Sequence, residues 1–205
     1  MANYNYDICI IGAGAGGLSV AAGACQFGIK VALIEGHNMG GDCLNYGCVP
    51  SKALLSSAKH YNAISESSKF GFSASAEPVN IAEVMAKVQE VIAQIAPHDS
   101  VERFTGLGAT VYRGYGSFVD EQSVKVNDDI ISAKYFIIAT GSSPVVHPIP
   151  GLNEVSYLTN ETIFNLQATP EHLVVIGGGP IGCELAQAFL MLGIKVSLLN
   201  LGKIL

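Results

Sequence analysis

Two cysteines separated by four residues, Cys43 and Cys48, stand out in the stretch GGDCLNYGCVPSK at residues 40–52. Such a pair can form a disulfide, bind a metal or supply two buried thiols. A structural zinc site needs four ligands, and no second Cys/His pair at a metal-like spacing accompanies these two. A stretch rich in Gly, Asp and Asn is also a poor place for core thiols. A redox-active disulfide explains more of the stretch than either alternative.

The residues that follow the pair support a reactive thiol. Pro50 suits the first position of a helix, so Cys48 is expected just before a helix amino terminus. The helix dipole stabilises a thiolate there, and Lys52 adds a positive charge nearby.

A glycine fingerprint precedes the cysteines. Gly12, Gly14 and Gly17 fit the pattern G-x-G-x-x-G between an apolar run and a helical stretch. The first glycine permits a tight turn, the second lets the backbone approach a pyrophosphate, and the third allows close helix–strand packing. Glu35 follows where a carboxylate accepts hydrogen bonds from a ribose diol. The fingerprint predicts a dinucleotide site.

A second fingerprint, formed by Gly177, Gly179 and Gly182, leads to Asn200 in place of an acid. Asparagine can hydrogen-bond a ribose hydroxyl, but it neither repels a 2′-phosphate as Glu would nor binds it as Arg would. The sequence therefore does not decide between NAD and NADP. Two dinucleotide sites in one chain usually mean electron transfer between a nicotinamide and a flavin.

The elements that must position these residues form an internal repeat. Residues 6–35 and 172–200 each read as strand–helix–strand, with 23 positions from the first glycine to the final polar residue. Between them we predict helices over 50–68 and 81–97. An antiparallel meander is expected from 109–119, 123–127 and 131–140, and a proline-broken segment, 141–152, is the candidate crossing between two domains.

Composition narrows the class of protein. Of the 205 residues 49% are hydrophobic and 14% charged, which suits a well-buried core, and the net charge of −6 with no basic cluster argues against nucleic acid as a partner. No apolar run is long enough to span a bilayer, and the amino terminus lacks signal-peptide features. A cytoplasmic location is the expectation. Five cysteines do not form a secreted disulfide framework.

The motifs GAGAGG, GGDCLNYGCVPSK, IIATGSSP and VIGGGPIGCELAQAF resemble those of the flavin-dependent pyridine nucleotide–disulfide oxidoreductases. The family includes dihydrolipoyl dehydrogenase, glutathione reductase and mercuric reductase, and the resemblance covers the whole chain. It implies an α/β fold: a Rossmann-like FAD-binding domain with an antiparallel meander at 1–145, then the first part of an NAD(P)-binding domain at 146–205. Because a doubly wound domain needs more strands, the chain is expected to be incomplete as a functional unit.

The resemblance also assigns roles. It implies that Cys48 faces the flavin as the charge-transfer thiol, that Cys43 exchanges with substrate, and that Lys52 and Glu184 form an ion pair within 4 Å beside the flavin ring. A lysine buried there would need the carboxylate as its partner. The expected cofactor-binding residues are Gly12, Gly14, Gly17, Glu35, Gly41, Asp42, Cys43, Lys52, Gly116, Ala139, Thr140, Gly141, Ser142, Gly177, Gly179, Pro180, Ile181, Gly182, Glu184 and Asn200.

Two departures from the family pattern bear on specificity. Asp42 stands where Thr is common, and a carboxylate near the FAD phosphates would be repelled unless it turns away or binds through water. Pro180 stands where glutathione reductase has a tyrosine lid, and the cysteine stretch offers few cations for the carboxylates of glutathione. The proline at position 180 and the small number of cations both argue against glutathione reductase.

Three functions are therefore weighed. The first is dihydrolipoyl dehydrogenase, in which a lipoyl dithiol reduces the Cys43–Cys48 disulfide and electrons pass through FAD to NAD⁺, in a homodimer. The second is a mercuric reductase, which runs electrons from NADPH to Hg²⁺. The third is a dinucleotide-binding module without catalysis of its own.

Overall fold

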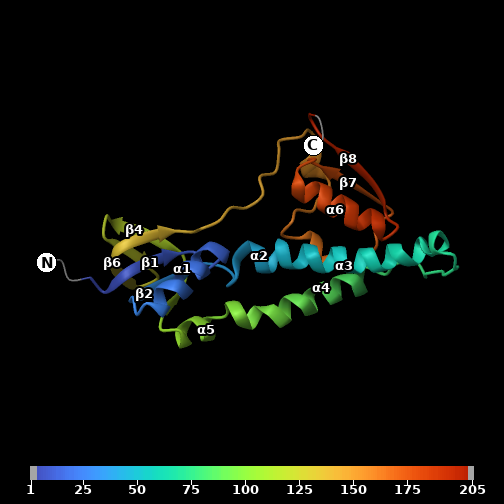
Figure 1. Ribbon diagram of the computed structural model, residues 1–205. Helices are drawn as coiled ribbons and strands as arrows, with labels where there is room; N and C mark the ends of the chain where they lie inside the picture. Colours follow the sequence, from blue (N-terminus) through green and yellow to red (C-terminus); the bar gives the residue numbers. More distant parts are fainter. Residues whose placement is uncertain (1–3, 203–205) are drawn as a thin grey trace. The chain divides into compact units, whose positions relative to one another are not determined.

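The computed structural model describes residues 4–202, coloured along the chain in Figure 1. The chain divides into two compact units. The first combines the residues up to Gly47 with Ile92–Tyr157, and the second combines Cys48–Val91 with the residues from Leu158 on. The predicted domain boundary at 145/146 stays a prediction.

A six-stranded sheet forms the centre of the first unit, in the order β3-β2-β1-β6-β5-β4. Pairing is parallel among β3, β2, β1 and β6, and antiparallel among β6, β5 and β4. Its strands are β1 Tyr6–Ile11, β2 Val31–Glu35, β3 Thr110–Arg113, β4 Gly116–Asp120, β5 Ser123–Val126 and β6 Asp129–Ile138. The strand–helix–strand reading of residues 6–35 is confirmed, with helix α1 at Ala15–Gln26 between β1 and β2.

The predicted meander is correct only from β4 onward. The stretch 109–119 was expected to be one antiparallel strand, but Thr110–Arg113 pairs parallel with β2 instead. Gly114 causes the break: its φ is 150°, which favours glycine, and its N–H donates to the carbonyl of Glu35 at 2.9 Å. The second half of β6 also pairs parallel with β1.

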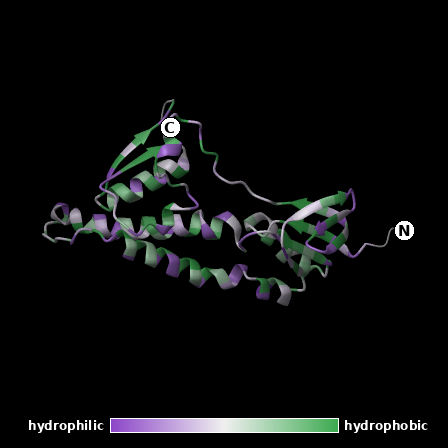
Figure 2. Ribbon diagram, turned by 180° about the vertical axis from the view of Figure 1, so that it is seen from behind, coloured by the Kyte–Doolittle hydropathy of each residue, from purple (hydrophilic) through white to green (hydrophobic). Residues whose placement is uncertain are grey.

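Two apolar clusters pack on the sheet of the first unit, whose strands are largely hydrophobic in Figure 2. One joins α1 to the sheet through buried residues such as Ile10, Leu18 and Leu33, with Phe104 packed against them. The other contains Cys9, Ile34 and the meander residues Val124, Val126 and Ile131. Parallel strands buried on both faces account for the continuous apolar runs of β1 and β2.

The second unit contains a pair of long helices and the second repeat. Its main elements are α3 Cys48–Ser65, α4 Ile81–Ile95 (which continues into the first unit), β7 His172–Ile176, α6 Pro180–Met191 and β8 Lys195–Leu199. Strands β7 and β8 pair in parallel, which confirms the strand–helix–strand reading of residues 172–200. The Gln89 side chain of α4 donates to the carbonyl of Phe164 at 3.2 Å, in the 3₁₀ turn η4 at Ile163–Asn165.

Helix α3 begins two residues earlier than predicted, at Cys48, so Pro50 is its third residue. The first four N–H groups of a helix lack partners within it, so a proline costs no hydrogen bond anywhere in the first turn. The helix also ends earlier, at Ser65, and a 3₁₀ turn, η1 at Ser67–Phe70, follows.

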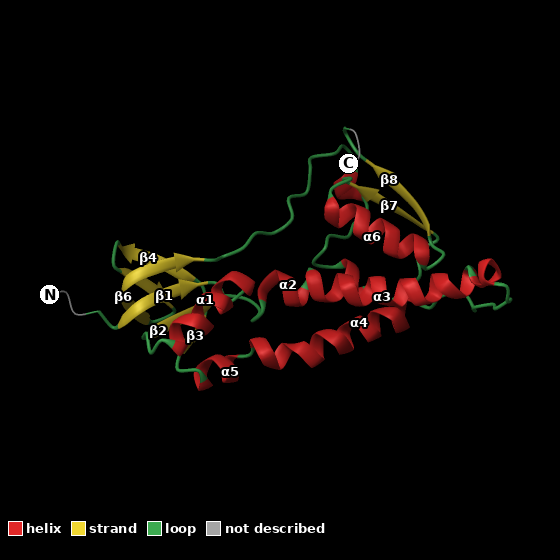
Figure 3. Cartoon of the chain, viewed as in Figure 1, coloured by secondary structure: helices red, strands yellow, loops and turns green. Residues whose placement is uncertain are grey.

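The remaining elements are short. They are α2 Gly41–Asn45, α5 Val101–Gly106, η2 Ala96–Asp99 and η3 Leu152–Glu154. Between β6 and η3 the chain forms neither helix nor strand, as predicted for the proline-broken segment (Figure 3). Within residues 4–202 no helix has the length and apolar character to cross a membrane.

Candidate dinucleotide loops and redox site

The two glycine loops share one backbone conformation. Gly12 has φ 106° and Gly177 has φ 113°, values that L side chains rarely adopt. Each donates its N–H at 2.8 Å to the carbonyl of the neighbouring strand, Gly12 to Ile34 and Gly177 to Leu199. The two repeats of the sequence therefore share the same loop conformation and the same loop-to-strand hydrogen bond.

The third glycine of each loop brings the helix against the loop. A Cβ added at Gly17 would lie 1.9 Å from the carbonyl oxygen of Gly12, and one at Gly182 would lie 2.0 Å from that of Gly177. No side chain fits at that distance. Helices α1 and α6 both start immediately after the second glycine of their loop, and a helix amino terminus at such a loop attracts a phosphate.

The polar residue at the end of each second strand binds the glycine loop. Glu35 is only 8% exposed, and its carboxylate accepts 2.6 Å hydrogen bonds from the N–H groups of Ala13 and His37. Asn200 makes the equivalent contact, since its Oδ1 accepts from the N–H of Gly178 at 3.1 Å. A carboxylate can accept about four hydrogen bonds, so Glu35 keeps capacity for the predicted ribose hydroxyls.

Neighbouring segments cover the first loop. The N–H of Gly40 donates to the carbonyl of Ala13 at 2.9 Å, and a Cβ on Gly41 would come within 2.5 Å of the Gly14 Cα. On the other side, a Cβ on Gly12 would meet the carbonyl oxygen of Ala139 at 2.2 Å. The segments 40–41 and 139–140 thus approach the loop as closely as backbone allows. Cβ atoms on Gly177 and Gly179 of the second loop would meet no described atom within 4 Å.

Helix α2 carries two predicted site residues. Asp42 lies in its first turn and is exposed, whereas Cys43 is partly buried. Asn45 holds the start of the helix, because its amide donates to the carbonyls of Met39 and Gly41 at 3.1 and 2.8 Å.

The other predicted cofactor residues lie at element ends. Gly116 begins β4, where an added Cβ would lie 3.1 Å from Val124 and 3.5 Å from Ile34, and Gly141 and exposed Ser142 follow β6. Pro180 is the first residue of α6, as its missing N–H permits, and Ile181 after it is 62% exposed. Their roles stay predictions.

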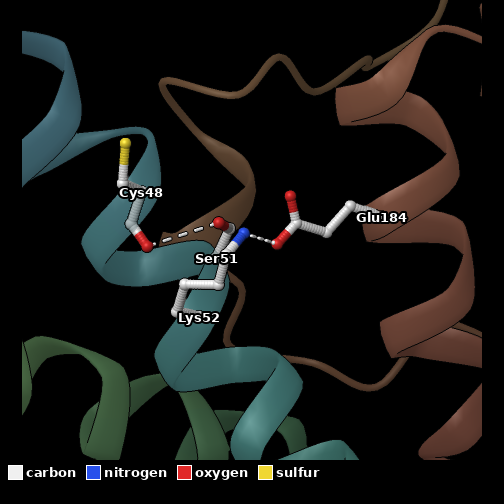
Figure 4. A network of polar contacts seen from close by, with 4 residues as sticks. All are labelled: Cys48, Ser51, Lys52 and Glu184. Carbon is white, nitrogen blue, oxygen red and sulfur yellow. Dashed lines mark hydrogen bonds and ion pairs between the residues drawn. The ribbon is translucent and has the colours of Figure 1, made fainter.

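Figure 4 shows Cys48, Ser51, Lys52 and Glu184 of the second unit: the Lys52 ammonium meets the Glu184 carboxylate, and the Cys48 sulfur points away from both. Exposed Cys48 is the first residue of α3, and Lys52 follows one turn later on the same helix. The Lys52 ammonium forms an ion pair with the Glu184 carboxylate of α6, which confirms the predicted pair. Ser51 donates to the carbonyl of Cys48 at 3.4 Å.

The ion pair is not buried in the described residues. Its side chain is 66% exposed and that of Glu184 is 26% exposed. Exposed ion pairs contribute at most about 1 kcal/mol to stability, so this pair fixes the lysine rather than holding the fold together.

Three further cysteines differ from the pair in their surroundings. Burial raises the pKa of the Cys9 thiol to about 11 and also raises the pKa of Cys25. Both thiols are therefore held in the neutral, unreactive form. The thiol of Cys183 in α6 donates to the carbonyl of Gly178 at 3.3 Å.

Sequence reasoning missed three residues near the first loop: Gly36, Gly40 and Tyr115. Gly40 makes the hydrogen bond to the loop described above. The Tyr115 ring lies against Gly36, with three ring atoms 2.7–3.0 Å from the position of a Gly36 Cβ. Gly114 and Gly116, which flank Tyr115 in the sequence, are the pattern that could have indicated a close backbone approach there.

Together these contacts fit a dinucleotide: backbone cradles that a Cβ would fill, helix amino termini behind them, and a polar side chain at the strand end. In the part of the chain from residue 4 to residue 202, no group of three or more His, Cys, Asp or Glu residues is arranged to hold a metal ion.

Comparison with known proteins identifies relatives of two kinds. The chain is 38% identical to the mercuric reductase of Staphylococcus aureus over 96% of its own length and 36% of the relative. It is 40% identical to that of Bacillus cereus, covering 97% of the chain and 31% of the relative. It is also 38% identical to the dihydrolipoyl dehydrogenase of Acholeplasma laidlawii, covering 96% and 60%. The chain thus spans less than two thirds of each relative.

A solved structure shares the fold. The Cu(II) complex of the HOCl-induced flavoprotein disulfide reductase RclA from Escherichia coli superposes with a TM-score of 0.79 at 28% identity, over 94% of this chain and 41% of that one. The family model for pyridine nucleotide-disulphide oxidoreductases matches residues 6–205. The chain therefore belongs to the pyridine nucleotide-disulphide oxidoreductase family, as its motifs predicted.

Proposed function

We propose that the chain serves a dithiol/disulfide oxidoreductase that uses FAD and a nicotinamide dinucleotide, with a lipoyl dithiol as substrate. The observation that carries this proposal is the arrangement of Cys48, Lys52 and Glu184. Cys48 is the first residue of α3, and Lys52, one turn later on the same helix, forms the ion pair with Glu184. The carboxylate that orients this cation comes from the helix of the second glycine loop.

The chemistry assigned to the cysteines balances in atoms and electrons. The substrate dithiol attacks the Cys43–Cys48 disulfide and becomes a disulfide itself, while the two cysteines become thiols. Two electrons and two protons leave the substrate in this exchange. Cys43 exchanges with the substrate, and Cys48 is the thiol that faces the flavin.

FAD is assigned to the first glycine loop. Gly14 is assigned to the approach of the diphosphate and Glu35 to the ribose, while Gly12 and Gly41 let the segments 139–140 and 40–41 pack against the loop. When bound there, FAD supplies a two-electron carrier between the cysteine pair and the nicotinamide.

The nicotinamide dinucleotide is assigned to the second loop, around Gly177, Gly179 and Gly182. Asn200 occupies the place of Glu35 but is neutral, so it does not exclude a 2′-phosphate by charge. NADH and NADPH are both compatible with this residue.

Mercuric ion is the second candidate substrate, because relatives that are 38% and 40% identical are named mercuric reductases. In that case Hg²⁺ takes two electrons from NADPH and leaves as the neutral metal, and Cys43 and Cys48 act as its thiolate ligands. A dinucleotide-binding module without catalysis is the third reading.

One experiment separates the three. The purified protein with FAD bound is mixed anaerobically with dihydrolipoamide, and flavin absorbance is followed. We expect rapid bleaching, loss of bleaching in Cys48→Ser and normal bleaching in the control Cys25→Ser. NADPH oxidation that depends on Hg²⁺, without reduction by dihydrolipoamide, would favour mercuric reductase. Binding of FAD with neither reaction would leave the non-catalytic module.

A further inference from the structure

Helix α2, which carries Cys43, is tied to the loop that precedes it. The Asn45 amide at the end of the helix donates to the carbonyls of Met39 and Gly41 at 3.1 and 2.8 Å. Within the preceding loop, the Gly41 N–H donates to the Asn38 carbonyl at 3.1 Å. The chain from Asn38 to the end of α2 therefore folds back on itself, with Cys43 inside the folded segment.

A hydrogen bond between two side chains closes this segment. The amide of exposed Asn38 donates to the hydroxyl of partly buried Tyr46 at 2.8 Å. We call this hydrogen bond the clasp. Its two residues stand five positions before Cys43 and three positions after it, so the clasp joins the chain on both sides of the thiol.

The backbone that follows Cys43 stays close to it. The Tyr46 N–H donates to the Asp42 carbonyl at 2.8 Å. A Cβ added at Gly47 would lie 3.0 Å from that carbonyl oxygen and 3.4 Å from the Cα of Cys43. The clasp therefore holds the chain at the point where it passes next to Cys43.

Tyr46 is one of the four residues between Cys43 and Cys48. A disulfide between these cysteines closes a short ring, and closing a ring costs conformational entropy. A connecting chain that is already ordered in the dithiol form loses less freedom when the disulfide forms again. A restraint on Tyr46 therefore raises the effective concentration of one thiol at the other.

We propose that Tyr46 is a positioning residue for the cysteine pair: its hydroxyl, held by Asn38, keeps the chain between Cys43 and Cys48 in the conformation that favours the disulfide. This inference rests on the proposed function, in which the pair cycles between disulfide and dithiol. Tyr46 acts through the backbone of the segment and not by contact with the substrate.

The first measurement is the thiol–disulfide equilibrium of the pair. The purified protein is equilibrated anaerobically with mixtures of reduced and oxidised dithiothreitol, quenched in acid and alkylated, and the tryptic peptide 31–52 is weighed. In this exchange dithiothreitol gives up two electrons and two protons and closes to its cyclic disulfide, while the protein disulfide becomes two thiols. The variants are Tyr46→Phe, Asn38→Ala, the combination of both, and Asn38→Asp.

We expect Tyr46→Phe and Asn38→Ala each to shift the equilibrium toward the dithiol by about fivefold, the factor that one hydrogen bond of ordinary net strength carries. For a two-electron couple, about fivefold is a rise in reduction potential of about 20 mV. The double variant should shift no further, because both single changes remove the same bond. Asn38→Asp should stay within about twofold of the wild type, since the tyrosine hydroxyl can donate to a carboxylate.

The second measurement does not depend on a disulfide. In the Cys48→Ser background, Cys43 is the one cysteine of the peptide 31–52, so its alkylation by iodoacetamide in the folded protein can be followed by mass. Tyr46→Phe should raise the alkylation rate by about fivefold, because partly buried Cys43 becomes more accessible when the segment opens.

Tyr61→Phe is the matched control for the loss of a tyrosine hydroxyl. The Tyr61 hydroxyl of α3 donates to the Glu77 carbonyl at 3.1 Å. Urea unfolding should show similar small losses of stability in Tyr46→Phe and Tyr61→Phe, because each loses one hydrogen bond. Of these two variants, only Tyr46→Phe should change the equilibrium and the alkylation rate.

The outcomes distinguish this inference from the proposed function. A normal disulfide whose equilibrium is unchanged in Tyr46→Phe and Asn38→Ala would overturn the role of Tyr46 and leave the proposed function standing, even if the alkylation rate changed. An equal shift in Tyr61→Phe would also overturn that role, because the effect would then belong to the fold in general. A wild type that forms no disulfide at any ratio of dithiothreitol would overturn the proposed function and the redox role of Tyr46 with it, and the alkylation rates would still show whether the clasp holds Cys43.

Discussion

The Lys52 ammonium and the Glu184 carboxylate form an ion pair across 132 residues of sequence, joining the helix that begins at Cys48 to the helix of the second glycine loop. Because Lys52 is mostly exposed, the pair contributes little to the stability of the fold. A substitution of Lys52 should therefore change the stability of the fold little, while its effect on the reaction can be large.

Lys52→Met should lower the free energy of unfolding by less than about 1 kcal/mol, because exposed pairs contribute little. Reduction of bound FAD by dithiol should slow by about tenfold or more, because Lys52 is proposed to stabilise the negative charge of the reduced flavin. Urea unfolding and anaerobic stopped-flow absorbance measure the two effects. Lys69→Met is the control, since it breaks the exposed Lys69–Glu66 pair of the same unit and should leave the reduction rate unchanged. Equal rate losses in both variants would contradict a specific role for Lys52.

Glu35→Ala should weaken FAD retention by about tenfold or more, through loss of charge-assisted hydrogen bonds to the ribose. It should also reduce stability by about 1–3 kcal/mol, because the N–H groups of Ala13 and His37 lose their acceptor. Glu35→Gln keeps one acceptor oxygen, so its FAD affinity and its stability should lie between those of the wild type and those of Glu35→Ala. Calorimetric titration with FAD and thermal unfolding measure these effects, and Asn200→Ala, which alters the other loop, should leave FAD affinity intact.

Gly17→Ala and Gly16→Ala are neighbouring changes with opposite expected outcomes. A Cβ at position 17 would lie 1.9 Å from the Gly12 carbonyl oxygen, whereas one at position 16 meets no described atom within 4 Å. Gly17→Ala should destabilise the first unit and abolish FAD binding, and Gly16→Ala should be neutral or stabilise α1 by up to about 1 kcal/mol. Thermal unfolding checks both, and similar behaviour of the two variants would show that helix and loop are not in close contact.

Alkaline pH should weaken the fold through Cys9. Burial raises the pKa of its thiol in the folded protein to about 11, from an ordinary value of 9.0. The unfolded chain therefore loses its proton first, so stability is complete below pH 9 and declines by about 2–3 kcal/mol as pH rises to 11. Cys9→Ala should lower stability at neutral pH by leaving a cavity but should show a shallower decline. Urea unfolding from pH 8 to pH 11 measures both slopes, and parallel slopes would rule out this contribution.

The sequence predicted the two glycine loops and their helices because strand–helix–strand geometry fixes the spacing of glycines and strand ends. Glu35 and Asn200, 23 positions after their first glycines, do reach equivalent N–H groups. The ion pair of Lys52 with Glu184 was also predicted, but from family resemblance, since no local pattern links residues so far apart.

Other features depend on long-range contacts that no local pattern encodes. The residues Thr110–Arg113 suit a parallel or an antiparallel strand equally, and only the hydrogen bonds to β2 decide between them. The exposure of Lys52 depends on what packs around α3. The contact of Tyr115 with Gly36 joins residues that meet only because β2 and β3 pair.

The central claim is that Cys43 and Cys48 form a reversible disulfide. Trypsin cleavage after Lys30 and Lys52 leaves both cysteines in one peptide, residues 31–52. The protein is denatured and alkylated before and after anaerobic treatment with dihydrolipoamide, and the peptide is weighed by mass spectrometry. We predict no alkyl groups before reduction and two after it, while Cys43→Ser carries one throughout. Two alkyl groups on the air-oxidised wild-type peptide, unchanged by the dithiol, would contradict the claim.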